Sequence, residues 1–275
     1  MLKQRVIFGA LGVILAILVL TFCNVTTIGV CVAVISMIGL YEFYNVTGVL
    51  KRKCPVVVAG FLFAALSFVG AVLHPEYLKT FMLPAVIAFV FVIMMITVIF
   101  HSKNTFSDSA LCFLGTVYIS LFFMHIILIR QYNFGKLLIW MLFISAWSTD
   151  TFAYFAGKVF GKHKLCPAIS PKKTIEGSVG GIAGCIIVIL IYSFICASVV
   201  GCRVNCLNAA LFACVASVVS QFGDLAASCI KREHNAKDYG NLIPGHGGIL
   251  DRFDSTLLIA PLSYYMFIYL PVFVK

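Results

Sequence analysis

The sequence has very few charged residues. Only 11% of its 275 residues are Asp, Glu, Lys or Arg, whereas soluble globular domains carry about 25%. Hydrophobic residues make up 62% of the chain, and the mean hydropathy is +1.06. This composition excludes an ordinary soluble domain and predicts an integral membrane protein.

Several patterns are also missing from the chain. The 11 cysteines include no CxxC pair and no histidine at zinc spacing, which argues against a zinc site. They are interpreted as small apolar packing residues, although Cys202 and Cys206 fall on one predicted loop and are able to pair there. No internal repeat or low-complexity tract is present, so nothing in the sequence divides the chain into the inverted halves of many transporters.

Long apolar runs are what the sequence does contain. Each is close to the roughly 20 residues that cross a bilayer as a helix. The runs are continuous rather than alternating, so we expect an all-α polytopic fold and not a barrel. The first run exceeds a signal-peptide core and has no small-x-small cleavage site after it, so it is predicted to be retained. The nine predicted spans are 6–23, 26–43, 55–73, 80–100, 108–129, 136–158, 178–200, 207–226 and 256–273.

The distribution of basic residues predicts the orientation of these spans. With the N-terminus inside, fifteen Lys and Arg residues fall on the inner side and five on the outer side. This bias places the two large polar loops, 158–177 and 227–255, in the cytoplasm. We therefore divide the chain into N-terminal membrane helices (1–135) and a C-terminal catalytic domain (136–275). The net charge of +10 is interpreted as a surface for anionic headgroups, with no nucleic acid as partner. The compact length, without a transit peptide, favours a bacterial inner membrane.

Two aspartates lie inside predicted spans. Glu42, Glu76 and Asp108 sit at span ends and require no special role, but Asp150 is within the sixth span and Asp224 near the end of the eighth. A carboxylate at membrane depth costs a few kcal/mol unless it has a partner. A hydrogen bond to a neighbouring Ser or Thr is the plain structural alternative, which we weigh most seriously for Asp150.

A polar stripe continues from Asp224 out of the membrane. Its members recur at i, i+4, i+7 and i+8 and therefore share one helical face. Such a stripe indicates the wall of a site. It consists of Asp224, Ser228, Lys231 and Arg232.

The first polar loop ends in a second group of basic residues. Lys172, Lys173 and Thr174 come just before a Glu-Gly step, and Ser170 is expected to cap the seventh span with Pro171 at its first helical position. Lysines beside the free amides of a helix N-terminus form a cradle for an anion. A general headgroup-binding surface is the alternative interpretation of this loop.

The second polar loop ends with two more carboxylates. In the turn PGHGG, Gly247 and Gly248 let the backbone approach a ligand, and His246 is able to donate to phosphate. Asp251 and Asp254 follow one helical turn apart, and their mutual repulsion implies a cation between them. Together with Asp224 and Asp150 they form a set of hard oxygen ligands that suits Mg²⁺.

The segment from Ser228 to Asp254, SCIKREHNAKDYGNLIPGHGGILDRFD, resembles the signature of the phosphatidate cytidylyltransferase family, also called CDP-diacylglycerol synthases. Two further segments are similar to that family, STDTFAYFAGKVFGKHK around Asp150 and SPKKTIEG from Ser170. The resemblance covers roughly the C-terminal half of the chain. The first five spans resemble the family in hydrophobic pattern only.

The resemblance implies transfer of a cytidylyl group from CTP to phosphatidic acid, with release of pyrophosphate, at a magnesium site on the cytoplasmic side. It also implies an all-helical membrane fold, a second monovalent cation such as K⁺, and a homodimer among membrane lipids. On this basis we assign the ligands of the metal to Asp224, Asp251, Asp254, Ser228 and Asp150. The catalytic residues are assigned to Lys231, Arg232, Lys237, Asp238 and His246, with Asp238 orienting Lys237 or the nucleotide. Substrate binding is assigned to Lys172, Lys173, Thr174, Arg252, Gly247 and Gly248.

Two other functions are weighed against this hypothesis. A CTP-dependent lipid-alcohol kinase, similar to polyprenol kinases, requires a base for a neutral hydroxyl and leaves phosphate on the lipid. A cation-coupled transporter predicts that polar residues continue to the outer side of the spans. The outer halves of these spans are almost wholly apolar, which argues against the transporter.

Overall fold

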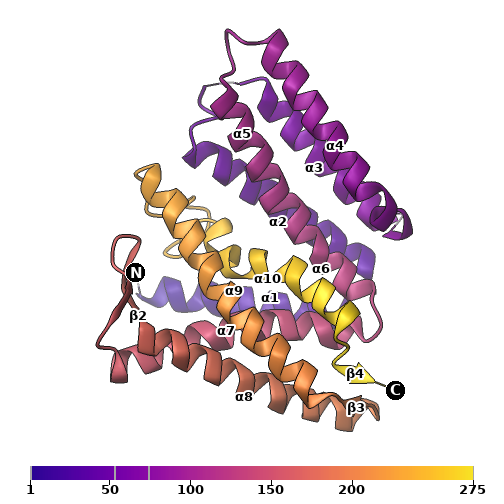
Figure 1. Cartoon of the computed structure of the whole chain (residues 1–275), viewed down its shortest axis with the longest axis vertical. Helices are drawn as coiled ribbons and strands as arrows, with labels where there is room; N and C mark the ends of the chain where they lie inside the picture. The colour runs from indigo at the N-terminus through magenta and orange to yellow at the C-terminus, as the bar shows by residue number, and fades with distance from the viewer. Residues whose placement is uncertain (1, 53, 74, 275) are drawn as a thin grey trace. The chain divides into compact units, whose positions relative to one another are not determined.

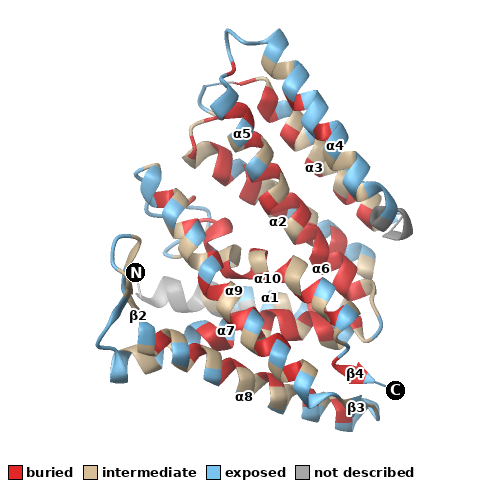
Figure 2. Cartoon of the chain, in the orientation of Figure 1, coloured by how far each residue is buried: buried red, intermediate tan, exposed pale blue. Residues whose placement is uncertain are grey.

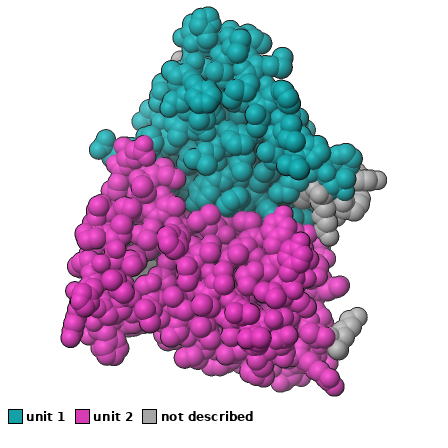
Figure 3. All heavy atoms as spheres, viewed as in Figure 1, with its two compact units in different colours: residues 1–128, 234–252 teal, residues 129–233, 253–275 magenta. Residues whose placement is uncertain are grey.

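The computed structural model describes residues 2–52, 54–73 and 75–274. This part of the chain is helical, with a few short strands (Figure 1). The chain separates into two compact units, shown in Figure 3. Unit 1 comprises residues 1–128 and 234–252, and unit 2 comprises 129–233 and 253–275. The sequence analysis divided the chain at residue 135 by expected function, into membrane helices and a catalytic domain. That division stays a prediction.

Unit 1 contains the N-terminal helices. The rod α5–η1–α6 corresponds to one predicted span, and its middle turn is π-helical. A capping box begins this rod, because the Thr105 side chain accepts from the Asp108 amide and Asp108 accepts from the Thr105 amide. The elements are α1 (Leu2–Phe22), α2 (Val25–Val46), α3 (Val56–Leu73), α4 (Pro75–Ile99), α5 (Phe106–Gly115), η1 (Thr116–Leu121) and α6 (Phe122–Gln131), whose last residues belong to unit 2.

A buried tyrosine joins α2 to its neighbours in unit 1. The Tyr44 hydroxyl lies 2.6 Å from the Thr116 hydroxyl and 3.2 Å from the Cys112 sulfur. Gly60 of α3 faces the same hydroxyl, and a Cβ at this position would collide with it. Close approach of α2, α3 and the α5–η1 rod around one polar contact therefore fixes the position of the end of α2 within unit 1.

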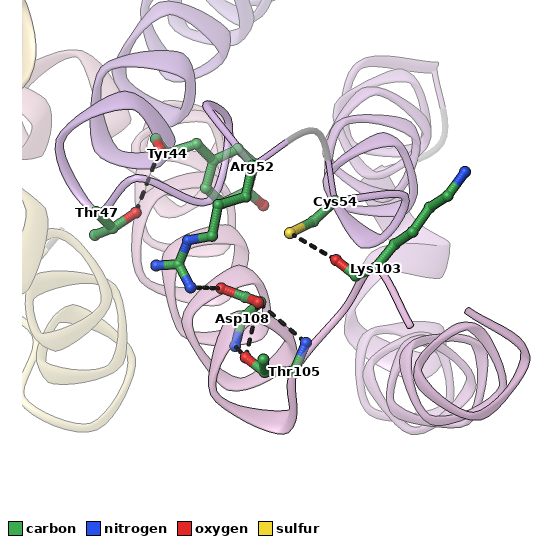
Figure 4. Close-up of polar contacts among 7 residues, drawn as sticks. All are labelled: Tyr44, Thr47, Arg52, Cys54, Lys103, Thr105 and Asp108. Atoms are coloured by element: carbon green, nitrogen blue, oxygen red, sulfur yellow. Dashed lines mark hydrogen bonds and ion pairs between the residues drawn. The ribbon is translucent and has the colours of Figure 1, made fainter. Parts of the chain in front are cut away.

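Polar contacts also join the two loops at the end of these helices (Figure 4). Arg52, in the loop after α2, forms an ion pair of 2.7 Å with the buried Asp108. The Cys54 thiol donates to the carbonyl of Lys103 at 3.5 Å. Asp108 therefore serves both as a helix cap and as the partner of a cation.

Unit 2 is built on closely packed helices. Four glycines of α8 face α7 at helical spacing, and Cβ atoms at Gly177 and Gly181 would lie 2.8 Å and 3.0 Å from α7 carbonyl oxygens. Small residues at this spacing let two membrane helices approach closely. The elements are α7 (Gly135–Phe160), β1 (Lys164–Cys166), β2 (Ser170–Thr174), α8 (Ile175–Val200), β3 (Arg203–Val204), α9 (Cys206–Glu233), α10 (Leu250–Tyr269) and β4 (Phe273–Val274); β1 pairs with β2 and β3 with β4, both antiparallel.

The helices have the length and composition of membrane spans. Seven helices in the described part of the chain are long and apolar enough to cross a membrane, and each of the nine apolar runs of the sequence overlaps helical structure. Many residues along helices such as α4 and α8 are exposed (Figure 2). Large apolar side chains are among them, as expected for surfaces that face lipid. The prediction of an all-α polytopic membrane protein is confirmed. The seven helices are 25–46, 56–73, 80–99, 106–131, 135–160, 175–200 and 206–233.

One local prediction is wrong. Ser170 does not cap α8; it begins strand β2, and the cap is Thr174, whose hydroxyl accepts from the Gly177 amide at 3.1 Å. The extended segment is retained because its backbone pairs with β1, where Lys164 lies opposite Thr174. All eleven cysteines lie in the described residues and all are free, including Cys202 and Cys206.

Candidate active site

Three aspartates of unit 2 form a cluster of carboxylates. Asp150 comes from α7, Asp224 from α9 and Asp254 from the first turns of α10. Their charges interact, since Asp224 acts electrostatically on both of the others and Asp150 acts on Asp254. Three helices far apart in sequence therefore bring three negative charges together, at a cost in repulsion that a structural role alone does not explain.

The helix contacts next to these aspartates explain how they meet. The hydroxyl of Thr149, which precedes Asp150, donates to the Ser217 hydroxyl of α9 at 2.9 Å. Gly223, which precedes Asp224, faces α10 so closely that a Cβ would lie 2.8 Å from the carbonyl oxygen of Asp254. A hydroxyl contact and a glycine contact thus place each carboxylate beside the next.

Two lysines balance part of this negative charge. The Lys173 ammonium lies 2.5 Å from Asp224 Oδ2, and it also acts electrostatically on Asp150. Both side chains of this pair are partly exposed, 25% for Lys173 and 31% for Asp224. Lys231 is buried and acts on Asp254. The cluster is therefore a site of mixed charge that is open to solvent at Lys173 and Asp224.

The β1–β2 hairpin holds Lys173 over the start of α8. Glu176, in the first turn of α8, accepts from the backbone amides of Lys162 and His163 and lies 2.6 Å from His163 Nδ1. Thr174 caps the same helix, and Lys172 is exposed beside it. Two lysines and a helix N-terminus thus lie together, as the sequence predicted, but on a strand rather than on a first helical turn.

In unit 1, Asp251 organises the loop between α9 and α10. Its Oδ2 atom accepts from the amides of Tyr239 at 2.7 Å and Gly248 at 3.0 Å. Gly247 has φ +83°, and a Cβ there would lie 2.9 Å from the same oxygen, so the turn requires glycine. The loop predicted to approach a ligand is therefore closed around a buried carboxylate.

His246 and the basic residues of this loop are differently placed. The His246 Nδ1 atom is buried and has no hydrogen-bond partner among the described residues. A buried polar atom of this kind normally has a hydrogen-bond partner. Lys237, Asp238 and Arg252 are exposed.

A carboxylate of α2 also belongs to this loop. Glu42 is buried, and its two oxygens accept from the amides of Ile249 at 2.9 Å and Leu250 at 2.8 Å. Sequence reasoning missed this residue because it lies at a span end, where a charge is ordinary. The only available signal was its place between aromatic residues in LYEFY, an apolar setting for a charge.

Comparisons with known proteins agree with the sequence motifs. A sequence model of the cytidylyltransferase family matches residues 3–270. The chain belongs to the cytidylyltransferase family. Phosphatidate cytidylyltransferase from Bacillus subtilis is 34% identical over 272 residues, which cover 96% of this chain and 97% of the relative. The proteins of the same name from Staphylococcus haemolyticus and Staphylococcus epidermidis are 34% and 36% identical, over 86% and 83% of this chain and 88% and 85% of theirs.

Membership of the cytidylyltransferase family confirms the prediction of a nucleotidyltransferase. The residues predicted for its site fall into two groups, one in each unit. In unit 2 the predicted site residues are Asp150, Lys172, Lys173, Thr174, Asp224, Ser228, Lys231, Arg232 and Asp254. In unit 1 they are Lys237, Asp238, His246, Gly247, Gly248, Asp251 and Arg252.

The donor chemistry of the cytidylyltransferase cluster fits a hard divalent cation. Carboxylate oxygens are the ligands that Mg²⁺ prefers, and Asp150, Asp224 and Asp254 share one electrostatic environment. In the described residues, no three His, Cys, Asp or Glu side chains are arranged to enclose an ion. Instead, the Lys173 ammonium pairs with Asp224 Oδ2. It supplies the positive charge of a cation there, without the coordination geometry of a metal ion.

Proposed function

We propose that this cytidylyltransferase transfers a cytidylyl group from CTP to phosphatidic acid, which gives CDP-diacylglycerol and pyrophosphate. The observation that carries the proposal is the cluster of Asp150, Asp224 and Asp254 with its paired Lys173, in a chain whose relatives are named phosphatidate cytidylyltransferases. Carboxylates beside cations at the end of membrane helices suit a reaction between a nucleotide and a lipid phosphate.

The reaction requires positioning and charge neutralisation more than a base. An oxygen of the lipid phosphate attacks the α-phosphorus of CTP, a new phosphorus–oxygen bond forms, and the bond between that phosphorus and the bridging oxygen to the β-phosphate breaks. The second pKa of a phosphate monoester is about 6, so the nucleophile is already anionic at pH 7. The protein must therefore reduce the repulsion between the two anions and stabilise the negative charge on the leaving pyrophosphate.

The acidic residues would hold Mg²⁺, through Asp150, Asp224 and Asp254 with Ser228 as a further oxygen ligand. When bound, the ion neutralises phosphate charge and orients the phosphates. Asp251 stays a predicted ligand; its Oδ2 atom already accepts from two backbone amides. A second, monovalent cation such as K⁺ is part of the proposal as well.

The basic residues would bind the phosphates. Lys173 approaches from the hairpin and Lys172 is exposed next to it, so both are suited to the polyphosphate of CTP. The buried Nδ1 of His246, which has no hydrogen-bond partner among the described residues, suits a phosphate oxygen. In this role Lys173 would exchange its contact with Asp224 for one with a phosphate of the substrate.

The proposal includes nine membrane spans, a cytoplasmic N-terminus and an active site on the cytoplasmic side of a bacterial plasma membrane. It is supported by helices α1 and α10, which overlap the first and last apolar runs, and by the fifteen to five bias of basic residues. A homodimer surrounded by membrane lipids completes the proposed arrangement.

A product assay tests this function. Membranes or purified protein receive phosphatidic acid, Mg²⁺ and CTP labelled at the α-phosphate, in parallel with CTP labelled at the γ-phosphate. Label from the α-phosphate is expected in the lipid fraction and label from the γ-phosphate in pyrophosphate, and a chelator is expected to stop both. Transfer of the γ-phosphate to a lipid alcohol would show a kinase instead.

A further inference from the structure

Glu42 of α2 is a buried charge that the reaction itself does not use. Only 5% of its surface is exposed, and it lies within unit 1 beside the segment 234–252, which contains the loop between α9 and α10 and the first residues of α10. Oε1 accepts from the amide of Ile249 and Oε2 from the amide of Leu250. Because each oxygen already accepts from a backbone amide, Glu42 is not placed to serve as a general base.

These two amides lie at the start of α10. The first amides of a helix have no partner inside the helix, and a negative charge at this end is favourable. Glu42 therefore caps α10 from a different helix, 207 and 208 positions away in sequence from the amides that it accepts from. A cap from a distant element stabilises the start of the helix, and it also fixes the position of that start relative to the element that supplies the cap.

The loop also packs directly on the Glu42 carboxylate. A Cβ at Gly240 would lie 2.6 Å from Oε1, and a Cβ at Gly248 would collide with both oxygens. One residue on, the Phe43 ring stacks on the ring of the buried Tyr239, with 6.5 Å between centroids. The chain is thus held against the same turn of α2 on both sides of His246, at Tyr239 and Gly240 before it and at Gly248 after it.

We propose that Glu42 is a positioning residue of the cytidylyltransferase reaction, which fixes the PGHGG loop and the start of α10. The residues that it positions are His246, in the loop between its two contact points, and Asp251, which shares the first turn of α10. Asp254 follows one turn later on the same helix. This inference rests on the proposed function, because it assigns Glu42 to the site of that reaction.

The variants that test the proposal are chosen by charge and shape. Glu42→Gln keeps the shape but places an NH₂ group against one of the two amides, and Glu42→Asp keeps the charge on a shorter side chain. Asp108→Asn is the matched control, because Asp108 is also a buried capping carboxylate in unit 1 but contacts Arg52 and Thr105 rather than the loop. Tyr41→Phe controls for changes on the exposed face of α2.

Two measurements are made on each purified variant. The first is kcat and KM for CTP and for phosphatidic acid, with amounts of protein corrected for the folded fraction. The second is the rate of tryptic cleavage after Lys237, which is exposed in the loop, and after Arg252, which is exposed in the first turn of α10. We expect Glu42→Gln to lose about 10- to 100-fold in kcat, as a misplacement of about 1 Å does, and to be cleaved faster in the loop. Glu42→Asp is expected to recover part of both losses.

The outcomes separate the proposal from the proposed function. Asp108→Asn is expected to lower the melting temperature while kcat and cleavage of the loop stay at the wild-type values. The inference is overturned if Glu42→Gln keeps the wild-type kcat, or if Asp108→Asn lowers kcat to the same extent at equal folded fraction. If the wild-type protein makes no CDP-diacylglycerol, the proposed function fails, whereas the cleavage rates still report whether Glu42 holds the loop.

Discussion

The Lys173 ammonium lies 2.5 Å from Asp224 Oδ2, so a lysine of the hairpin pairs with a carboxylate proposed to hold Mg²⁺. Removing the lysine and removing the carboxylate are therefore expected to have opposite effects on the concentration of Mg²⁺ that activity requires. In Lys173→Met the carboxylate loses a competing cation, so the half-saturating concentration of Mg²⁺ stays equal or falls while kcat drops about 100-fold. In Asp224→Asn the half-saturating concentration of Mg²⁺ rises.

Titration of activity with Mg²⁺ measures both effects. Lys164→Met is the control, since Lys164 is an exposed lysine in the same hairpin, and it is expected to change neither parameter by more than about twofold. A rise in the Mg²⁺ requirement of Lys173→Met would contradict the proposed competition.

Asp254→Asn is expected to separate activity from stability. The side chain interacts with Asp224 and Asp150, so neutralising it relieves repulsion among the three clustered carboxylates. We expect activity to fall by at least about 100-fold and the melting temperature in detergent to stay the same or rise. Glu233→Gln, which changes an exposed carboxylate at the end of α9, serves as the control and should leave both unchanged. Retained activity in Asp254→Asn would remove this residue from the metal site.

The sequence predicted the helices because a bilayer imposes a simple length and composition on each of them. It also predicted that Asp150, Asp224 and Asp254 belong together, since a carboxylate within an apolar run requires a partner. Glu42 was not predictable in this way, because its partners are the backbone amides of Ile249 and Leu250. Nearly every residue has a backbone amide, so the sequence does not show which ones a carboxylate will bind. The prediction for Ser170 was wrong because a serine before a helix can be a cap or part of a strand. Only the pairing of β2 with β1, which the local sequence does not reveal, decides between the two.

Substitution of Gly248 is expected to damage the loop more than its size suggests. A Cβ at this position meets both oxygens of Glu42, so Gly248→Ala must displace either the loop or α2. We expect a loss of about 2 kcal/mol in stability and a fall in kcat. Gly70→Ala, in α3, is the control: among the described residues no atom beyond its own helix turn lies within 4 Å of its Cβ position, and alanine favours a helix by up to about 1 kcal/mol over glycine. A Gly248→Ala variant as stable and active as Gly70→Ala would contradict the close packing of this loop on Glu42.

The Cys54 thiol gives a chemical test of the loop contacts in unit 1. Burial raises the pKa of this thiol, and the nearby Asp108 carboxylate raises the pKa further while Arg52 lowers it. The thiolate is the reactive form, so Cys54 is expected to react with iodoacetamide several-fold more slowly than the exposed Cys229 at pH 7.5. Asp108→Asn removes the negative charge and should speed the reaction at Cys54, whereas Arg52→Gln should slow it. Mass spectrometry of timed samples measures both rates in one protein, with Cys229 as the internal reference. Equal rates at Cys54 in the two variants would contradict the electrostatic effect of Asp108 and Arg52, whose ion pair is drawn in Figure 4, on the Cys54 thiol.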